Sequence, residues 1–298
     1  MTDKLRGMVL ASFVGDALSL GAHWIYDTDV IKSSFGRVEN FLPPSPGSYH
    51  ANKKKGDFTH YGDQTLVLLR SISQGNRFDL SLFGSNWQEF IRSYEGYLDK
   101  ASKTTLANFD DGKDCFNSGS SSNDLGGAAR IAPLLYHYRS DLETTLSYAR
   151  EQTAMTHNST AAIIAADFLC RVTWVVLDGA SPREAIEQEL ANGIEDITVD
   201  MRIRNVLEEQ QSSTTSIIKQ CGQACDAMGA LPAVVHLVTK YSDNLQDALI
   251  ENVMAGGDSA ARGLAAGMIL GAHLGQEAIP KQWLEDMISA EEVLSLLK

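Results

Sequence analysis

The sequence predicts an all-α protein that folds as one domain over residues 1–298. Apolar residues recur at intervals of three and four through most of the chain, as on the buried face of a helix. No alternating apolar and polar run is long enough to indicate a sheet. Residues 181–184, Ser-Pro-Arg-Glu, form a capping box with proline at the first helical position. These three observations favour helices throughout.

Small residues are interspersed with large apolar ones at the start of the chain, so residues 4–22 are predicted to form a helix packed closely against others. A long loop is expected between Phe35 and Tyr61, because prolines and glycines there restrict the backbone and few positions are apolar. Loops of this length often carry function. The next helical segments are residues 65–73, 80–100 and 125–138, and a polar loop covers residues 108–123.

Cap residues mark the starts of later helices. Asp141 and Ser159 are predicted N-caps, since their side chains can accept hydrogen bonds from free backbone N–H groups. The helix after Ser159 covers residues 160–177. Its last residues also favour a strand, but they continue the preceding helical pattern, which favours a helix. The remaining helical segments are residues 199–209, 225–241, 245–254, 259–273 and 280–297.

The composition restricts the partners and the compartment. The chain has 38 acidic and 25 basic side chains and a net charge of -13, which disfavours a nucleic acid or an anionic membrane as partner. No apolar run reaches the length of a bilayer span, and the start lacks a signal peptide, so we expect a cytoplasmic protein. The four cysteines show no disulfide pattern. Cys221 and Cys225 lack a second pair to complete a zinc site.

Three aspartates each follow a glycine and precede a helix-compatible segment: Asp16, Asp63 and Asp258. One interpretation is capping, because an Asp at a helix start accepts a backbone hydrogen bond and its charge suits the helix dipole. The other is that the carboxylates converge on a hard cation such as Mg²⁺, which prefers oxygen ligands. A buried charge persists only with partners. We therefore expect the three in one cleft, with Asp63 and Asp258 closest to each other.

Five short motifs occur in order along the chain. They are Gly15-Asp16-Ala17-Leu18, Gly62-Asp63-Gln64-Thr65, residues 126–133, Thr156-His157-Asn158 and Gly256-Gly257-Asp258-Ser259. In this order they resemble the ADP-ribosylglycohydrolases over nearly the whole chain, and residues 13–27 and 229–234 look most like the J1-crystallin and selenoprotein J branch. The resemblance implies an orthogonal all-α bundle whose cleft holds two Mg²⁺ ions. It also implies hydrolysis of the N- or O-glycosidic bond that joins ADP-ribose to a protein side chain.

The resemblance also assigns metal ligands by position. The retained positions, which are the predicted metal ligands, are Asp63, Thr65, Asp258 and Ser259. The chain departs from the family pattern of Thr, Asp, Asp, Thr and Glu at Gly62, Gln64, Ala260, Ala261 and His23 respectively. Two carboxylates do not easily neutralise two buried divalent ions. The sequence therefore predicts a single Mg²⁺ ion or none.

Three histidines lie beside the family motifs. As ligands, His23, His60 and His157 would favour Zn²⁺ or another transition metal, with Asp63 or Asp258 as the oxygen donor. A histidine beside a carboxylate can also serve as general acid or base. The candidate catalytic residues are therefore Asp63, His23 and His157. The alternative is that the histidines are hydrogen-bonded residues of the cleft with no chemical role.

Glycine-rich loops are the candidate ligand contacts. Backbone N–H groups ahead of a helix can bind a pyrophosphate, although such loops are often only solvated connections. Trp24, Tyr26 and Tyr61 are candidates for stacking on adenine, with core packing as the alternative. The candidate substrate-binding residues are Asp16, Ser122, Asn123, Gly126, Gly127, Gly256 and Gly257.

Two functions follow from these observations. The first is hydrolysis of ADP-ribosyl or related glycosidic conjugates at an altered or partly lost metal site, with an ADP-ribose-like molecule or an ADP-ribosylated protein as partner. The second is a non-catalytic role, as a nucleotide-ribose binder or a structural crystallin-like protein. Missing oxygen ligands remove transition-state stabilisation while the loops that admit a ligand remain. We therefore expect weak or absent release of ADP-ribose.

Overall fold

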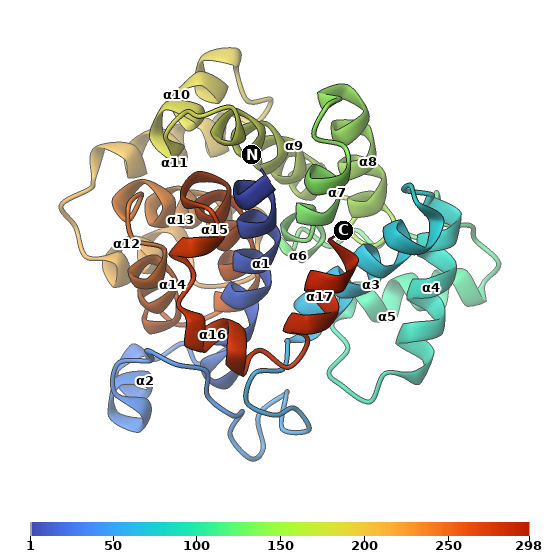
Figure 1. The fold of residues 1–298 in the computed structure, drawn as a ribbon, viewed down its shortest axis with the longest axis horizontal. Helices are drawn as coiled ribbons and strands as arrows, with labels where there is room; N and C mark the ends of the chain where they lie inside the picture. Colours follow the sequence, from blue (N-terminus) through green and yellow to red (C-terminus); the bar gives the residue numbers. More distant parts are fainter. Residues whose placement is uncertain (1, 298) are drawn as a thin grey trace.

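A computed structural model describes residues 2–297, which form helices and two isolated β-bridges but no β-strand. The prediction of an all-α protein is confirmed. The helices cross one another around a hydrophobic core to which segments from both ends of the chain contribute (Figure 1).

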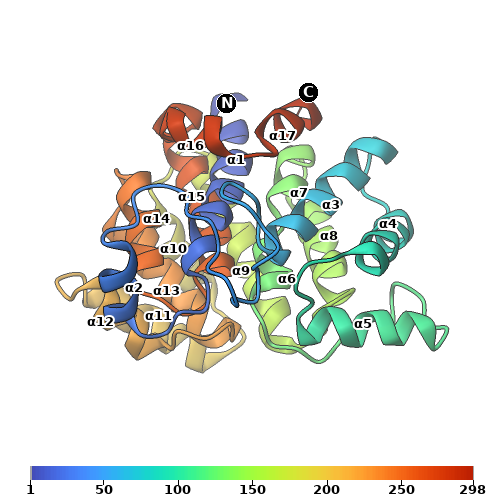
Figure 2. The ribbon, with the colours of Figure 1, turned by 90° about the horizontal axis from the view of Figure 1, so that it is seen from below.

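Two helices from opposite ends of the chain lie side by side at the centre of the molecule (Figures 1 and 2). They are α1 (Thr2–Ser19) and α15 (Ser259–Leu274), and both are buried along most of their length. Glycines allow their backbones to touch: a Cβ on Gly267 would lie 2.6 Å from the carbonyl carbon of Ala11. This contact fixes the end of α1 relative to the start of α15, where the candidate site is found.

The other helices form two groups, one on each side of the central pair (Figure 2). One group contains α3 (His60–Gly75), α4 (Leu80–Ser93), α5 (Lys100–Asp110), α6 (Gly126–Ala129), α7 (Ala132–His137) and α8 (Leu142–Ala154). The other contains α10 (Pro182–Asn192), α11 (Ile197–Glu208), α12 (Thr214–Cys221), α13 (Ala227–Lys240) and α14 (Leu245–Met254). Between them, α9 (Thr160–Leu177) contacts α8, α10 and α15.

The predicted helix caps are confirmed. Asp141 accepts a hydrogen bond from the N–H of Thr144, and Ser159 accepts one from the N–H of Ala162. The reciprocal capping box of residues 181–184 is present at the start of α10. These signals depend on neighbouring residues alone, which is why the sequence is sufficient to find them.

Several predicted helices are interrupted. The segment 80–100 ends its helix at Ser93, and a loop then leads to Asp99, which caps α5. The segment 125–138 divides into α6 and α7, with Pro133 in the first turn of α7. The segment 280–297 divides into α16 (Lys281–Asp286) and α17 (Ala290–Leu296). The short helices α2 (Thr28–Phe35), α5 and α12 contain few apolar residues with helical spacing, and the sequence does not predict them.

The start of α3 matters for the site. It begins at His60 rather than at Thr65, because Thr59 caps it by accepting a hydrogen bond from the N–H of Tyr61. His60 and Tyr61 therefore stand at the helix start. Asp63 lies further along the first turn.

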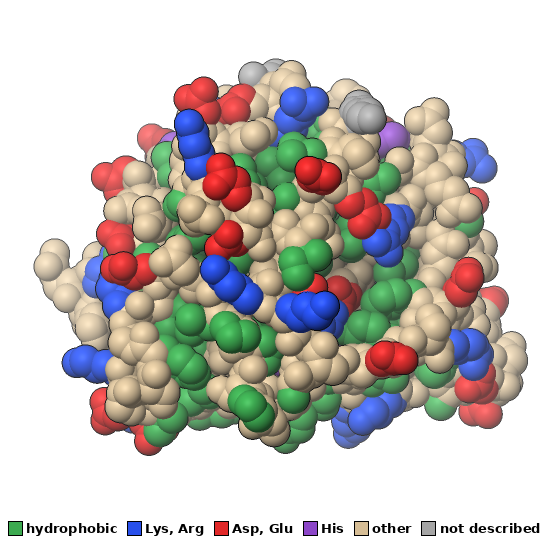
Figure 3. Space-filling view, turned by 60° about the horizontal axis from the view of Figure 1, so that its bottom comes forward, with side chains coloured by type: hydrophobic (Ala, Val, Ile, Leu, Met, Phe, Trp, Pro, Cys, Tyr) green, Lys and Arg blue, Asp and Glu red, His purple; other side chains and the backbone are tan. Residues whose placement is uncertain are grey.

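Two helices have the length and mean hydropathy of membrane spans, Thr2–Ala22 and Thr160–Leu177. The expectation that no apolar segment reaches this length is therefore wrong. In the fold, 89% and 61% of their most apolar windows are buried, which is typical of core helices. On the face seen from the side of α2 and the loop that follows it, acidic and basic side chains are interspersed with hydrophobic ones (Figure 3).

His236 gives a prediction on the pH dependence of stability. Its Nε2 lies 3.1 Å from the hydroxyl of Thr214, and burial, followed by the charge of Lys240, lowers the pKa of His236 to about 4. The folded pKa lies below the unfolded value of 6.5, because the folded state favours the neutral ring. The contribution of His236 to the free energy of unfolding is therefore complete above pH 6.5 and is lost as the pH falls toward 4. Urea unfolding should show that His236→Gln loses less stability over this range, by on the order of 2 kcal/mol. Equal losses in both proteins would contradict this assignment.

Candidate functional site

The turn before α15 is built on two glycines. Gly256 and Gly257 have φ angles of 69° and 70°, which L side chains rarely adopt. The turn presents Asp258, which is buried and caps α15. Its Oδ2 accepts hydrogen bonds from the hydroxyl of Tyr61 at 2.8 Å and from Nε1 of Trp24 at 3.3 Å. Trp24, in the segment that follows α1, and Tyr61 of α3 therefore meet at the carboxylate that caps α15.

The segment 120–125 is held by backbone pairing on both sides. Its start pairs with His157 in an isolated β-bridge, and its end donates a 2.8 Å hydrogen bond to the carbonyl of Cys225. The N–H of Asp258 donates to the carbonyl of Gln223 at 2.7 Å, which ties the same stretch to α15. Segments that are distant in sequence are thus joined by main-chain hydrogen bonds around one point.

Asp124 lies at that point. Its Oδ1 accepts the N–H of Gly126 at 2.7 Å, and its Oδ2 accepts the hydroxyl of Tyr61 at 2.9 Å. That hydroxyl also lies 2.8 Å from Asp258 and carries one hydrogen, which two carboxylates have to share. Burial, followed by the charges of Asp258 and Asp99, raises the pKa of Asp124 to about 7. Asp124 is therefore only partly ionised near neutral pH.

Two overlapping groups of donor atoms meet at Asp124. Asp99, Asp124 and His157 form one, and Asp124, Cys225 and Asp258 form the other; within each group the donor atoms lie within 4.8 Å of one another. We call these five residues the donor cluster. Nε2 of His157 and Oδ2 of Asp99 have no hydrogen-bond partner among the described residues. Buried polar atoms without partners are uncommon, so these two atoms mark a position for a ligand.

His157 is oriented through its other ring nitrogen. Nδ1 lies 2.8 Å from the hydroxyl of Thr156, which also accepts a hydrogen bond from the buried Arg130. Burial, only partly opposed by the charge of Asp99, lowers the pKa of His157 to about 4. The ring is neutral at physiological pH, which is the form that binds metals.

Asp99 pairs with His60. Its Oδ2 lies 3.4 Å from Nε2 of His60, an ion-pair contact without the alignment of a hydrogen bond, and Nδ1 of His60 lies 3.3 Å from Nε2 of His50. Burial lowers the pKa of His60, but the interaction with Asp99 and the charges of Asp258 and Asp124 outweigh it and raise that pKa. Conversely, burial raises the pKa of Asp99, but His60 more than offsets this and holds it well below its usual range.

Three aromatic side chains lie beside the donor cluster. The ring centroids of Trp24 and Tyr49 are 5.1 Å apart, those of Trp24 and Tyr97 are 4.9 Å apart, and those of Tyr49 and Tyr97 are 5.0 Å apart. We call these three residues the aromatic rim. Trp24 has a φ of 64°, unusual for a bulky residue, and its N–H donates to the carbonyl of Gly257 at 3.0 Å. Tyr49 is 65% exposed, so the rim reaches the solvent.

Asp63 lies outside the donor cluster. Its carboxylate pairs with Lys53 and accepts a hydrogen bond from Tyr94. Asp258 has Asp124 as its neighbouring carboxylate, and the expected pairing of Asp63 with Asp258 is not found. The reason is the earlier start of α3, which turns Asp63 away from the helix end.

Thr65 and Ser259 are both buried. The hydroxyl of Thr65 donates to the carbonyl of Tyr61 at 2.9 Å, one turn earlier in α3. The hydroxyl of Ser259 has no partner among the described residues, and its carbonyl accepts from Ser19 at 3.0 Å. Of the two predicted carboxylate ligands, Asp258 belongs to the donor cluster and Asp63 does not.

Asp16 holds the start of α3. It accepts hydrogen bonds from the N–H and hydroxyl of Thr59 at 2.7 and 2.6 Å and from the N–H of Gly62 at 3.2 Å. Burial raises the pKa of Asp16 to about 6, although the bonds from Thr59 oppose the shift. Its carboxylate is thus occupied by the backbone rather than by a ligand.

Asp16→Ala should destabilise the protein by about 2 kcal/mol, because buried N–H groups of Thr59 and Gly62 lose their acceptor. Urea unfolding of this variant and of Asp29→Ala, which removes an exposed aspartate of α2, measures the difference. Equal stabilities of the two variants would remove the proposed anchoring role.

Gln64, which the sequence resemblance matched to an Asp of the family, belongs to a polar network in the core. Its Oε1 accepts from Nε1 of Trp87 at 2.8 Å and from Arg130 at 3.2 Å, and its Nε2 donates to Ser102 at 3.3 Å. An Asp at this position would therefore not add a ligand to the donor cluster.

The predicted substrate-binding glycines make room for side chains of the site. A Cβ on Gly126 would lie 2.5 Å from Cδ1 of Tyr61, and one on Gly127 would lie 2.8 Å from Nδ1 of His157. Gly256 and Gly257 are equally enclosed, against the carbonyls of Ile25 and Gln223. In the neighbouring loop, Ser122 accepts the N–H of Asp124 at 3.3 Å, and Asn123 donates to Asp226 at 3.1 Å. These residues therefore contact other parts of the protein around the site.

His23 is buried beside Trp24, with ring centroids 4.3 Å apart. Neither ring nitrogen has a partner among the described residues. Burial, followed by the charges of His50 and His60, lowers the pKa of His23 well below its usual value. The ring is therefore neutral near neutral pH and carries a single N–H.

Sequence reasoning missed Asp99, Asp124 and Cys225. Asp99 precedes a helix, and Asp124 comes just before the glycines of α6, but neither follows a glycine as Asp258 does. No local signal distinguishes Cys225, because main-chain pairing between distant segments is what places it beside Asp124.

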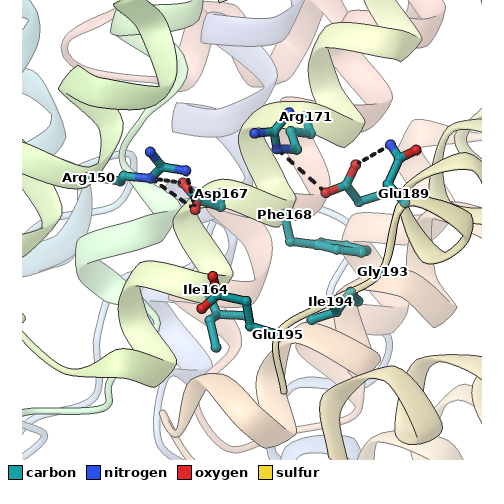
Figure 4. Close-up of a pocket in the computed structure, with 10 residues that line it drawn as sticks. Arg150, Ile164, Asp167, Phe168, Arg171, Glu189, Gly193, Ile194 and Glu195 are labelled. Atoms are coloured by element: carbon teal, nitrogen blue, oxygen red, sulfur yellow. Dashed lines mark hydrogen bonds and ion pairs between the residues drawn. The ribbon is translucent and has the colours of Figure 1, made fainter. Parts of the chain in front are cut away.

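A cavity of about 340 Å³ lies elsewhere, between α8, α9 and the loop after α10 (Figure 4). Its arginines already have acidic partners: Arg150 donates to Asp167 at 2.7 Å, and Arg171 lies 3.7 Å from Glu189. Because its charges are paired and no donor-cluster residue lines it, this cavity is not the candidate site.

The sequence profile of the family described as ADP-ribosylglycohydrolase matches residues 1–298. The chain belongs to the ADP-ribosylglycohydrolase family. Its relatives include an uncharacterised protein of Archaeoglobus fulgidus, 27% identical over 98% of this chain and 93% of that protein. Crystallin J1A of Tripedalia cystophora is 21% identical over 98% and 94% of the two chains. ADP-ribosylhydrolase ARH3 of Mus musculus is 22% identical over 97% and 88%.

A solved structure described as an ADP-ribosylglycohydrolase-related protein complex matches this chain with a TM-score of 0.79. It is 23% identical and covers 99% of this chain and 96% of its own. The fold is therefore that of the ADP-ribosylglycohydrolases. The resemblance expected from the five motifs, with J1-crystallins among the relatives, is confirmed.

Proposed function

We propose that this ADP-ribosylglycohydrolase hydrolyses the glycosidic bond of ADP-ribosyl or related conjugates with a divalent cation held by the donor cluster. The observation that carries this proposal is the meeting of three buried carboxylates, Asp99, Asp124 and Asp258, at two overlapping groups of donor atoms. The expectation of weak release assumed two carboxylates at the site. Three carboxylates neutralise divalent cations better than two, so the reason for expecting weak release is largely removed.

The donor cluster fits a cation. Its carboxylates come from three segments, and their mutual repulsion helps to raise the pKa of Asp124. A divalent cation would favour their ionised forms and would give partners to Nε2 of His157 and Oδ2 of Asp99. When bound, such a cation orients sugar hydroxyls and water and stabilises charge in the transition state.

Other interactions complete the proposed site. Within the donor cluster, the carboxylates of Asp124 and Asp258 would stabilise the positive charge that a ribose ring develops as the glycosidic bond breaks. The hydroxyl of Tyr61 bridges these two carboxylates and fixes their separation. The aromatic rim offers ring surface to a nucleobase at the solvent side of the site.

The alternative function is binding or a structural role without hydrolysis. One contact favours it: Oδ2 of Asp258 already accepts hydrogen bonds from Tyr61 and Trp24, and these compete with a cation for the same oxygen. The relationship to crystallin J1A points the same way. In this case the protein would bind ADP-ribose, or nothing, without cleaving a conjugate.

Matched variants separate the two functions. Release of ADP-ribose from serine- and arginine-linked peptides is measured with Mg²⁺, Mn²⁺ or Zn²⁺ and with a chelator. We expect cation-dependent release that Asp258→Asn abolishes and Asp63→Asn retains, because Asp63 lies outside the donor cluster. Binding of ADP-ribose without release would support the binder, and no binding would support a structural role. Equal losses in both variants would show that the donor cluster is not the site.

A further inference from the structure

The donor set of this site is not that of magnesium. Mg²⁺ takes oxygen ligands and retains several waters. The donor cluster offers, besides carboxylate oxygens, the imidazole nitrogen of His157 and the sulfur of Cys225. Imidazole and thiolate are ligands that Zn²⁺ and related transition metals prefer. The nitrogen and sulfur donors therefore favour a softer cation than Mg²⁺.

Cys225 is held in place by the main chain. The N–H of Leu125 donates to its carbonyl at 2.8 Å, and the N–H of Ala227 donates to the carbonyl of Asn123 at 2.8 Å. This pairing sets the sulfur within 4.8 Å of oxygens of both Asp124 and Asp258. The sulfur is thus a fixed member of the site.

His157 is also oriented as a metal ligand. Its unpartnered Nε2 is buried and lies within 4.8 Å of Asp99 and Asp124 oxygens, while Thr156 fixes its Nδ1. A hydrogen bond at one ring nitrogen is the usual means of orienting a metal-binding histidine.

The grouping of the donors bears on the number of ions, because the five residues form two groups that share Asp124. Each group has three protein donors, the number that catalytic zinc sites commonly use when they keep a position open. Asp124 belongs to both groups and can bridge them.

We infer that the donor cluster binds two adjacent cations of the Zn²⁺ class that share Asp124, one with Asp99 and His157 and the other with Cys225 and Asp258. The inference rests on the proposed function for the site and names its cations. It differs from the Mg²⁺ expected from sequence, because three of the five donors were not recognised there.

Cobalt, a spectroscopic probe for zinc sites, tests the inference on the full chain after removal of metals with a chelator. We expect two Co²⁺ ions per chain and a thiolate-to-cobalt charge-transfer band in the near ultraviolet, both resistant to a large excess of Mg²⁺. Cys225→Ser should lose the band. Cys221→Ser is the matched control and should keep it, because Cys221 is a free cysteine outside the donor cluster.

A second variant assigns the two positions. His157→Ala should bind one Co²⁺ ion and keep the band, since Cys225 belongs to the other group. Circular dichroism confirms that each variant is folded, and the unmodified protein with the Cys221→Ser control decides the question even if Cys225→Ser does not fold. In the unmodified protein, absence of the band, binding of only one Co²⁺ ion per chain, or displacement of Co²⁺ by equimolar Mg²⁺ would overturn the inference.

The same experiments distinguish failure of this inference from failure of the proposed function. If Co²⁺ binds with the sulfur band but ADP-ribose is not released, the inference stands and the proposed hydrolysis is wrong. If release requires Mg²⁺ and no sulfur band is seen, the hydrolysis stands and the inference is wrong.

Discussion

Replacing Gly267 with alanine should destabilise the protein by about 4 kcal/mol, because the added methyl group meets the backbone of α1. The new Cβ would lie 2.6 Å from the carbonyl carbon of Ala11, and backbone atoms cannot rotate away as a flexible side chain can. The two helices have to separate, and the packing along both is lost. Chemical denaturation followed by circular dichroism measures the change.

Gly75→Ala is the control for this effect. Gly75 ends α3, and a Cβ there would meet only the terminal methyl group of Leu82, at 3.1 Å. We expect little change in the free energy of unfolding, since that side chain can move. Similar effects of the two alanines would show that the contact between α1 and α15 is not tight.

Asp124→Asn should reduce the release of ADP-ribose roughly a hundred- to a thousandfold, while the stability of the cation-free protein stays equal or rises. Asp124 is the residue common to both donor groups, so its loss weakens every position for a cation. The same change removes a carboxylate that burial, Asp258 and Asp99 disfavour in its charged form. Loss of function with gain of stability is typical of residues retained for chemistry.

Thermal unfolding in the presence of a chelator and single-turnover release of ADP-ribose are the two measurements. A variant that keeps its activity would show that Asp124 is only structural. A variant that loses stability together with activity would show that Asp124 holds the segment 120–125 in place.

The helices that the sequence predicts well are those whose limits are set locally. Ser159 and the capping box at Ser181 act on residues within one turn, so α9 and α10 begin where expected. The start of α3 was missed because its cap, Thr59, is fixed by Asp16, 43 positions earlier in the chain. Sequence spacing cannot reveal such a contact.

The same distinction explains the candidate site. Asp258 was found because its glycine turn and helix cap are adjacent in sequence. Asp124 and Cys225 come together through pairing between residues 123–125 and 225–227, which only the folded chain shows. Asp63 was assigned to the site because it follows a glycine before a helix-compatible segment and falls in one of the five family motifs. In the structure, α3 starts at His60, and the carboxylate of Asp63 pairs with Lys53 and accepts a hydrogen bond from Tyr94.

The contact between α1 and α15 has a consequence for synthesis on the ribosome. Residues 2–19 leave the exit tunnel some 240 residues before the helix that covers them, residues 259–274. Until then the apolar surface of α1 has no permanent partner, and nascent chains with such exposed surface are prone to aggregate. Folding of the core is therefore delayed until α15 has emerged, and a chaperone that shields α1 should raise the yield of the protein.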